Sequence, residues 1–252
     1  MDIKLSGKCA LITGATAGIG EAAANLFAAE GVKLVLSGRR EDALKTLADK
    51  IAATGAPEPA MIVGALDSPD GCAKVAAEAL DASNGQIDIL FNNAGASMPM
   101  TDLWDEEKWT ASLQLNFAAA RQITAAIVPG MKTRKWGRII TTTGAMVSPV
   151  PNAAIPAKAA LQSWSRSLSM QLAPFGITVN TIAPGRIDTA QIRNTVHPTE
   201  ESRLAFIDKF IPAGHFGEPE DLAVLAVFLA SPLAGYINGA AIPVDGAMLR
   251  IT

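Results

Sequence analysis

Cysteine and histidine are scarce in this sequence, with two of each among 252 residues. The cysteines, Cys9 and Cys72, cannot build a disulfide framework and lack the spacing of metal ligands, so we expect no metal site. A run of about eighteen apolar residues is also missing, which excludes a membrane-spanning helix. No basic and then apolar leader opens the chain, so a cytoplasmic protein is expected. The net charge of −3 gives no electrostatic reason to bind nucleic acid.

Short apolar runs alternate with longer helical stretches along the whole chain. The apolar runs, expected to be strands, are residues 9–13, 33–37, 60–66, 87–91, 138–142, 178–182 and 241–244. The helical stretches are residues 19–30, 41–53, 69–83, 106–132, 154–173 and 219–230. Continuous apolar strands are typical of a parallel sheet that helices cover on both faces. The pattern predicts one α/β domain with a Rossmann-like, doubly wound parallel β-sheet, whose ligands bind beyond the carboxyl ends of the strands.

A glycine-rich loop joins the first strand to the first helix and reads Thr-Gly-Ala-Thr-Ala-Gly-Ile-Gly over residues 13–20. Gly14 allows a tight turn, Gly18 lets a pyrophosphate approach the backbone, and Gly20 lets the helix pack on the strand. The helix N-terminus offers N–H groups to phosphate oxygens. The loop, with Thr16 and Ile19, therefore predicts a dinucleotide site, the alternative being a plain strand-to-helix turn.

The spacing Gly-x-x-x-Gly-x-Gly resembles that of the short-chain dehydrogenase/reductase family. The resemblance extends to further motifs in the family's order: Asn92-Asn93-Ala94-Gly95, Asn116, Gly137-Arg138-Ile139-Ile140, Lys158, the segment Pro184-Gly185-Arg186-Ile187-Asp188-Thr189, and Val244-Asp245-Gly246. It implies that Asn92, Ala94 and Gly95 line the cofactor's ribose. It further implies that Ile187 and Thr189, after Pro184 and Gly185, hold the nicotinamide carboxamide, and that residues 189–210 form a substrate lid.

The end of the second strand indicates which dinucleotide is bound. Proteins that bind NAD usually place an acidic residue there, which accepts hydrogen bonds from the ribose 2′-hydroxyl. This chain has Gly38 at that place and Arg39 next to it. A guanidinium binds a 2′-phosphate through two parallel hydrogen bonds, and Ser37 adds a hydroxyl. The sequence therefore favours NADP(H) over NAD(H), the alternative being that Arg39 and Arg40 are solvated residues at a helix start.

The catalytic residues depart from the family's pattern. The resemblance implies a serine, a tyrosine four residues before a lysine, and a helix asparagine. Lys158 and Asn116 are present, but Ala154 stands at the tyrosine position and Gly144 at the serine position. Thr143 and Ser148 are the nearest hydroxyls, and Tyr236, the one tyrosine, is expected to be structural. Asn116 and Lys158 remain the catalytic candidates, and Lys158 is also expected to bind the nicotinamide ribose.

Four other residues are candidates for the missing acid. His197 lies in the expected lid and is either a pocket residue or an ordinary surface histidine. His215 is expected to be structural. Arg186 and Asp188 flank the nicotinamide segment and are weaker candidates.

Three functions fit these residues: an NADP(H)-dependent oxidoreductase acting on a small carbonyl or alcohol, a lyase or isomerase with a retained dinucleotide, and a redox-inert NADP(H)-binding protein. The resemblance also implies that residues 106–132 and 154–173 pair across a two-fold axis. A second axis through the last strand then gives a homotetramer, with a homodimer as the alternative.

Overall fold

Seven parallel strands form one sheet in the computed structural model, which describes residues 2–144 and 151–248. The strands are β1 Cys9–Thr13, β2 Lys33–Gly38, β3 Ala60–Val63, β4 Ile89–Asn92, β5 Gly137–Thr142, β6 Ile177–Pro184 and β7 Ala241–Val244. Their order across the sheet is β3-β2-β1-β4-β5-β6-β7, and each neighbouring pair is parallel. The chain order therefore reverses beside β1, which lies between β2 and β4.

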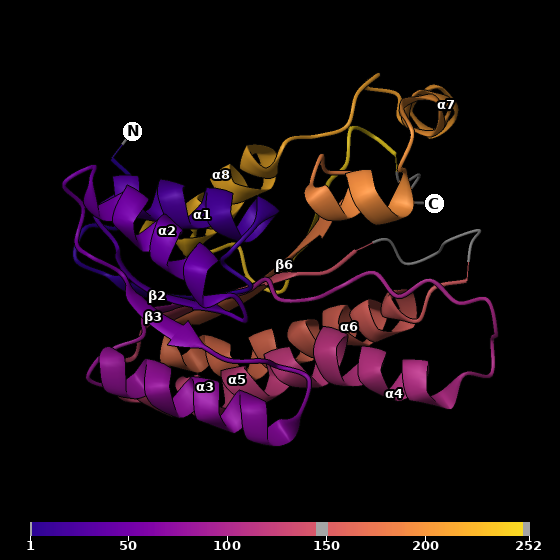
Figure 1. Cartoon of the computed structure of the whole chain (residues 1–252). Coiled ribbons are helices and arrows are strands. Elements are labelled where there is room, and N and C mark those ends of the chain that lie inside the picture. Colours follow the sequence, from indigo (N-terminus) through magenta and orange to yellow (C-terminus); the bar gives the residue numbers. More distant parts are fainter. Residues whose placement is uncertain (1, 145–150, 249–252) are drawn as a thin grey trace.

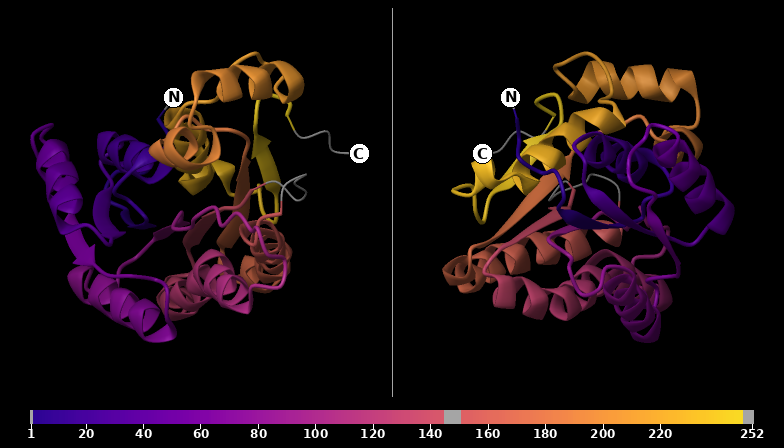
Figure 2. Two further views of the ribbon diagram at one scale, coloured as in Figure 1. Left: turned by 45° about the vertical axis from the view of Figure 1, so that its right-hand side comes forward. Right: turned by 90° about the vertical axis from the view of Figure 1, so that its left-hand side faces the viewer.

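Helices cover both faces of this sheet, as Figures 1 and 2 show. The helices are α1 Gly18–Ala29, α2 Glu41–Ala52, α3 Pro69–Ala82, α4 Glu106–Leu113, α5 Ala119–Arg134, α6 Ala154–Leu172, α7 Glu200–Phe210 and α8 Pro219–Ala230. Figure 1 places α1, α2 and α8 on one face and α3 to α6 on the other. The single-domain, Rossmann-like fold predicted from the sequence is confirmed.

Alternate residues of the central strands enter the two apolar cores. On β1, Ile12 packs with Phe27 of α1, whereas Leu11 packs with Val75 of α3. All four side chains are fully buried. A strand covered on both faces has no polar side, which explains why these strands read as continuous apolar runs.

One helix expected from the sequence is interrupted. The stretch 106–132 is divided into α4 and α5 by one π-helical turn, Gln114–Ala118, which contains Asn116. The Asn116 amide Nδ2 donates a hydrogen bond to Ser112 Oγ, and Asn116 Oδ1 accepts one from the Ala96 amide, 3.0 Å away. Such turns are common at functional sites because they redirect a side chain out of the regular helical spacing.

Helix α7 was not predicted from the sequence. None of its residues is buried, so its apolar positions have no core-facing period to detect. In the described part of the chain, no helix is long and apolar enough to cross a membrane.

Candidate functional site

The glycine-rich loop has the backbone shape that its sequence predicts. Gly14 and Gly18 adopt positive φ angles of 65° and 54°. A Cβ on Gly20 would lie 2.2 Å from the Gly14 carbonyl oxygen, so no side chain fits there. The N-cap residue of α1 is Ala17, and no side chain caps this helix end. The first-turn N–H groups of α1 are thus left to bind phosphate oxygens.

The ends of β1 and β4 are joined through Thr13 and Asn93. Thr13 Oγ1 accepts hydrogen bonds from the amides of Asn93 and Ala94, 3.1 and 3.2 Å away. Asn93 Nδ2 donates to the Gly14 carbonyl oxygen, and Asn93 Oδ1 accepts from Thr142 Oγ1. Asn93 therefore connects the phosphate loop to β5, a role that the sequence analysis missed.

Asn92, which is expected at the ribose, has a buried side chain at the end of β4. Asn92 is 3% exposed, and its Nδ2 donates to Thr124 Oγ1 of α5. Asn92 Oδ1 is also buried and has no hydrogen-bond partner among the described residues. Ala94 and Gly95 lie at the carboxyl end of β4, as expected.

Asn116 and Lys158 converge on Gly95. A Cβ on Gly95 would lie 2.8 Å from both Asn116 Oδ1 and Lys158 Nζ. Lys158 Nζ donates a hydrogen bond to the Thr142 carbonyl oxygen, 2.9 Å away. Burial lowers the pKa of Lys158 to about 8. The two catalytic candidates thus meet at the carboxyl ends of β4 and β5, although they are 42 positions apart in the sequence.

Asn152 fixes the start of α6, the helix that carries Lys158. Asn152 Oδ1 accepts hydrogen bonds from the amides of Met98 and Ala154, and Asn152 Nδ2 donates to Ser97 Oγ. These contacts fasten the helix start to the loop after β4. Ala154, at the tyrosine position, is buried with 7% exposure and offers only a methyl group.

The serine position is also next to the lysine. A Cβ on Gly144 would lie 3.9 Å from Lys158 Cδ, which is ordinary van der Waals contact. Thr143, one of the two alternative hydroxyls, donates to the Ile182 carbonyl oxygen and is buried. Ser148, the other, lies outside the described residues. Tyr236 is fully exposed and belongs to the turn before β7, so it is not part of this site.

At the end of β2, Ser37, Gly38 and Arg39 lie beside the phosphate loop. A Cβ on Gly38 would lie 2.7 Å from Thr16 Cγ2. Ser37 Oγ is buried and has no hydrogen-bond partner among the described residues. Arg39 is exposed. Arg40, not Arg39, contacts the loop, because its Nη2 donates to the Thr16 carbonyl oxygen, 3.0 Å away.

The segment after β6 closes the other side of the phosphate loop. Thr189 Cγ2 would lie 2.9 Å from a Cβ on Gly18, so this threonine contacts the loop. Ile187 is buried, and the Asp188 amide donates to the Gly217 carbonyl oxygen. Pro184 ends β6, and the Gly185 amide donates a hydrogen bond to the Val244 carbonyl oxygen. The residues expected around the nicotinamide therefore share one edge with the glycine-rich loop.

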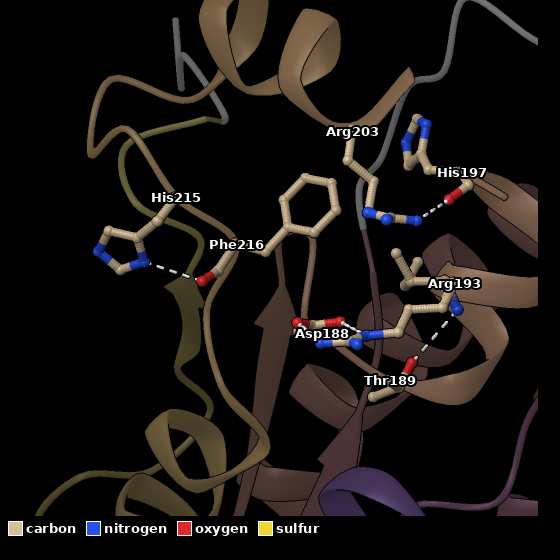
Figure 3. A network of polar contacts seen from close by, with 8 residues as sticks. Asp188, Thr189, Arg193, His197, Arg203, His215 and Phe216 are labelled. Atoms are coloured by element: carbon tan, nitrogen blue, oxygen red, sulfur yellow. Dashed lines mark hydrogen bonds and ion pairs between the residues drawn. The ribbon is translucent and has the colours of Figure 1, made fainter. Parts of the chain in front are cut away.

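Polar contacts organise the segment 186–216, which Figure 3 shows from close by. Arg193 forms an ion pair with Asp188, and Arg203 Nη1 donates to the His197 carbonyl oxygen. His197 Nε2 accepts a hydrogen bond from Arg186 Nε, and its ring lies 4.6 Å from that of Phe206. Burial, reinforced by the charges of Arg186 and Arg203, lowers the pKa of His197. A neutral histidine whose Nε2 accepts a hydrogen bond is a poor proton donor, so His197 does not suit the role of the missing acid.

His215 Nδ1 lies 2.8 Å from the carbonyl oxygen of the next residue, Phe216 (Figure 3). Within residues 2–144 and 151–248, no group of three or more histidine, cysteine, aspartate or glutamate residues has the arrangement of a metal site.

The arrangement fits a nicotinamide dinucleotide. The positive-φ glycines and the uncapped helix α1 suit the pyrophosphate, Ser37 Oγ lacks a partner at the end of β2, and Lys158 lies where β4 and β5 end. These features lie at the point where the strand order reverses, which is where doubly wound sheets bind ligands.

Known proteins resemble the chain over almost its full length. A family model described as Enoyl-(Acyl carrier protein) reductase matches residues 14–248. The 3-oxoacyl-(acyl-carrier-protein) reductase of Vibrio cholerae serotype O1 is 33% identical over 254 residues, covering 99% of this chain and 100% of that protein.

Solved structures agree with the sequence relatives. L-sorbose reductase from Gluconobacter frateurii, solved with NADPH and L-sorbose, matches with a TM-score of 0.95 and 33% identity over 100% of both chains. A 7α-hydroxysteroid dehydrogenase, solved with NADH and 7-oxo glycochenodeoxycholic acid, matches with a TM-score of 0.90 and 30% identity, covering 99% of this chain and 97% of that chain. The chain belongs to the short-chain dehydrogenase/reductase family of NAD(P)-dependent oxidoreductases.

Proposed function

We propose that this protein is an NADP(H)-dependent oxidoreductase that interconverts a small carbonyl compound and its alcohol without a catalytic tyrosine. The observation that carries the proposal is the convergence of Lys158 Nζ and Asn116 Oδ1 on Gly95, at the carboxyl ends of β4 and β5. In a redox-inert binding protein the same amine would only bind the nicotinamide ribose, so turnover is what separates the two functions.

The choice of NADP(H) rests on the end of β2. No acidic residue stands at Gly38, and Arg39 is an exposed cation beside the phosphate loop. The similar L-sorbose reductase was solved with NADPH, but the similar hydroxysteroid dehydrogenase was solved with NADH. The family fold accommodates both dinucleotides, so the preference depends on these residues of the chain.

Lys158 acts as the acid in this proposal. When bound, NADPH supplies the hydride that reaches the carbonyl carbon. Lys158 Nζ gives one proton to the carbonyl oxygen as the C=O bond becomes a C–O single bond, and the amine then regains a proton from water. An acid is most effective when its pKa lies near the working pH, and the pKa of Lys158 is about 8. Ala154, four residues before Lys158, offers only a methyl group and no competing acid.

Asn116 positions this acid. Its Oδ1 holds the Ala96 amide, and both Oδ1 and the Lys158 amine lie against Gly95. The π-helical turn that carries Asn116 therefore holds in place the backbone at Gly95 and Ala96, against which the lysine lies. Replacing Asn116 with alanine removes this support without removing the amine.

The test follows NADPH oxidation with a panel of ketones and aldehydes, and NADP⁺ reduction with the matching alcohols. The expected result is turnover by the wild type and a loss of about 10²–10⁴ in kcat for Lys158→Met, the range for removing a general acid. NADPH affinity, measured by nicotinamide fluorescence, is the control for binding. No turnover of any substrate by a wild type that binds NADPH would refute an oxidoreductase.

Two alternatives take account of the single, exposed tyrosine. Product formation without a net change of cofactor absorbance indicates a lyase or isomerase. Tight NADPH binding without turnover or product indicates a redox-inert binding protein.

A further inference from the structure

Three arginines of the segment 186–203 differ in the partners of their guanidinium groups. Arg193 is paired with Asp188, and Arg203 is bonded to the His197 carbonyl oxygen. Arg186 forms no ion pair with any described residue, although burial lowers the pKa of its guanidinium. Removing a charge from water without a counter-ion costs free energy, so such a group is retained where it has a use.

The Arg186 guanidinium is held in a fixed orientation. Its Nε donates a hydrogen bond to His197 Nε2, 3.3 Å away. Its Cζ lies 4.7 Å from the ring centroid of Phe206 on α7, so the aromatic ring covers one face of the guanidinium. The two terminal nitrogens, Nη1 and Nη2, have no hydrogen-bond partner among the described residues. Two parallel N–H groups in this state match the two oxygens of a carboxylate.

Arg186 also lines a cavity of about 310 Å³, together with Ile187, His215, Gly217, Asp221 and Asp245, among others. The two carboxylates of this lining each accept a hydrogen bond from a backbone amide. Asp221 Oδ2 accepts a hydrogen bond from the Glu218 amide at the start of α8, and Asp245 Oδ1 accepts one from the Ala247 amide. A volume of this size is at the lower end for small-molecule pockets, which are about 300–1,000 Å³.

The cavity lies beside the segment that contacts the phosphate loop. Ile187, which follows Arg186, is expected to hold the nicotinamide carboxamide, and Thr189 contacts the phosphate loop at Gly18. His197 and Phe206, which orient the guanidinium, belong to the segment 189–210 that is expected to cover the substrate.

We propose that Arg186 binds a carboxylate of the substrate, so that the protein acts on small oxo acids or hydroxy acids. This proposal rests on the proposed function. Arg186 binds the carboxylate through Nη1 and Nη2, while His197 and Phe206 are positioning residues that keep those nitrogens free. The carbonyl group of the same substrate reaches Lys158.

The test compares oxo acids with their methyl esters, using carbonyl positions from the second to the sixth carbon so that the separation of carboxylate and carbonyl group is varied. The wild type is expected to show a kcat/KM at least tenfold higher for the best acid than for its ester. In Arg186→Gln this ratio is expected to fall to about one, mainly through KM for the acid. In Arg186→Lys it is expected to take an intermediate value, because an ammonium binds a carboxylate as a point charge.

Arg193→Gln is the matched control, because it removes a guanidinium of the same segment that already has a carboxylate partner, and it is expected to keep the acid preference. Equal kcat/KM values for acids and esters in the wild type, or an unchanged ratio in both Arg186 variants, would overturn the proposal.

A binding measurement separates this proposal from the proposed function. Titration calorimetry in the presence of NADP⁺ follows propanoate, butanoate, pentanoate and hexanoate, with the corresponding amides as neutral probes. Binding of at least one carboxylate by the wild type, and its loss in Arg186→Gln, supports the anion site even if no substrate is turned over. The absence of carboxylate binding to the wild type, or equal binding to the variant, contradicts the anion site while leaving the oxidoreductase proposal to its own test.

Discussion

Arg40 Nη2 donates a hydrogen bond to the Thr16 carbonyl oxygen at 3.0 Å, and the same nitrogen lies 3.3 Å from Thr16 Oγ1. This contact ties the start of α2 to the middle of the phosphate loop. It gives neighbouring arginines different roles, since Arg40 supports the loop and Arg39 is exposed beside it.

The first prediction is that the protein binds NADPH at least about tenfold more tightly than NADH, a difference of about 1.4 kcal/mol. Arg39→Gln is expected to abolish most of this preference, because it removes the charge assigned to the 2′-phosphate. Fluorescence titration of both dinucleotides measures the effect.

Arg40→Gln is the control for the first prediction. It is expected to weaken both dinucleotides alike, because it loosens the loop that both use. If Arg40→Gln rather than Arg39→Gln removes the preference, the phosphate contact is assigned to the wrong arginine. Equal wild-type affinities for NADPH and NADH would exclude the assignment altogether.

The second prediction concerns Lys158 and pH. Its folded-state pKa of about 8 lies below its ordinary value of 10.5. The unfolded chain therefore binds more protons between these two values, and the free energy of unfolding rises as the pH increases from about 8 to above 10. Lys158→Met removes the cost of burying the charged amine. The variant is therefore expected to be more stable than the wild type near neutral pH, with a smaller difference near pH 10.

Urea denaturation of both proteins at several pH values tests this expectation. Because other groups also titrate in this range, only the difference between wild type and variant is compared. A difference that does not depend on pH would show that the amine is well solvated in the folded protein.

Much of the fold follows from the sequence because its signals are local or periodic. Strands such as β1 are covered on both faces, so Leu11 and Ile12 are both apolar and the run is visible. Gly14, Gly18 and Gly20 are required by backbone geometry, which a short motif records directly.

Other features depend on contacts between distant residues and leave no local pattern. Asn93 joins Gly14 to Thr142, and Asn152 joins Met98 to Ala154, across separations that a motif does not cover. Contacts with distant residues likewise decide that the Asn92 side chain bonds Thr124 and that Arg40, rather than Arg39, bonds the phosphate loop. Helix α7 has no buried face and so gives no periodic signal.

The third prediction is that the protein assembles as a tetramer, with a dimer as the alternative. Apolar side chains remain exposed on the two helices expected to pair: Leu113 of α4 is 44% exposed and Met170 of α6 is 68% exposed. Near β7, Leu233 is 48% exposed and Tyr236 fully exposed, and among the described strands β7 lies at one edge of the sheet. Burying these surfaces and covering the edge favours association.

Light scattering on a sizing column measures the assembly. Met170→Glu is expected to weaken the helix-pairing interface, and Leu233→Glu the interface at β7, so each single variant is expected to give a dimer. A wild type that is monomeric at micromolar concentration would contradict the prediction.

The last prediction concerns the missing tyrosine and serine. If Ala154 and Gly144 stand at their positions, Ala154→Tyr combined with Gly144→Ser is expected to increase NADPH-dependent ketone reduction over the wild type. Among the described residues, a Cβ at Gly144 meets Lys158 Cδ alone, at 3.9 Å, which is ordinary van der Waals contact. Losing a positioned general acid costs about 10²–10⁴ in rate, which bounds the possible gain.

The pH profile of the same reaction gives a second readout. If Lys158 is the acid, wild-type reduction falls as the pH rises through about 8, the pKa at which the ammonium loses its proton. In the double variant this fall is expected to change, because the new phenol takes over the proton transfer. An unchanged rate and profile in a double variant that still binds NADPH would show that the chain before Lys158 does not bring residue 154 to the reacting oxygen.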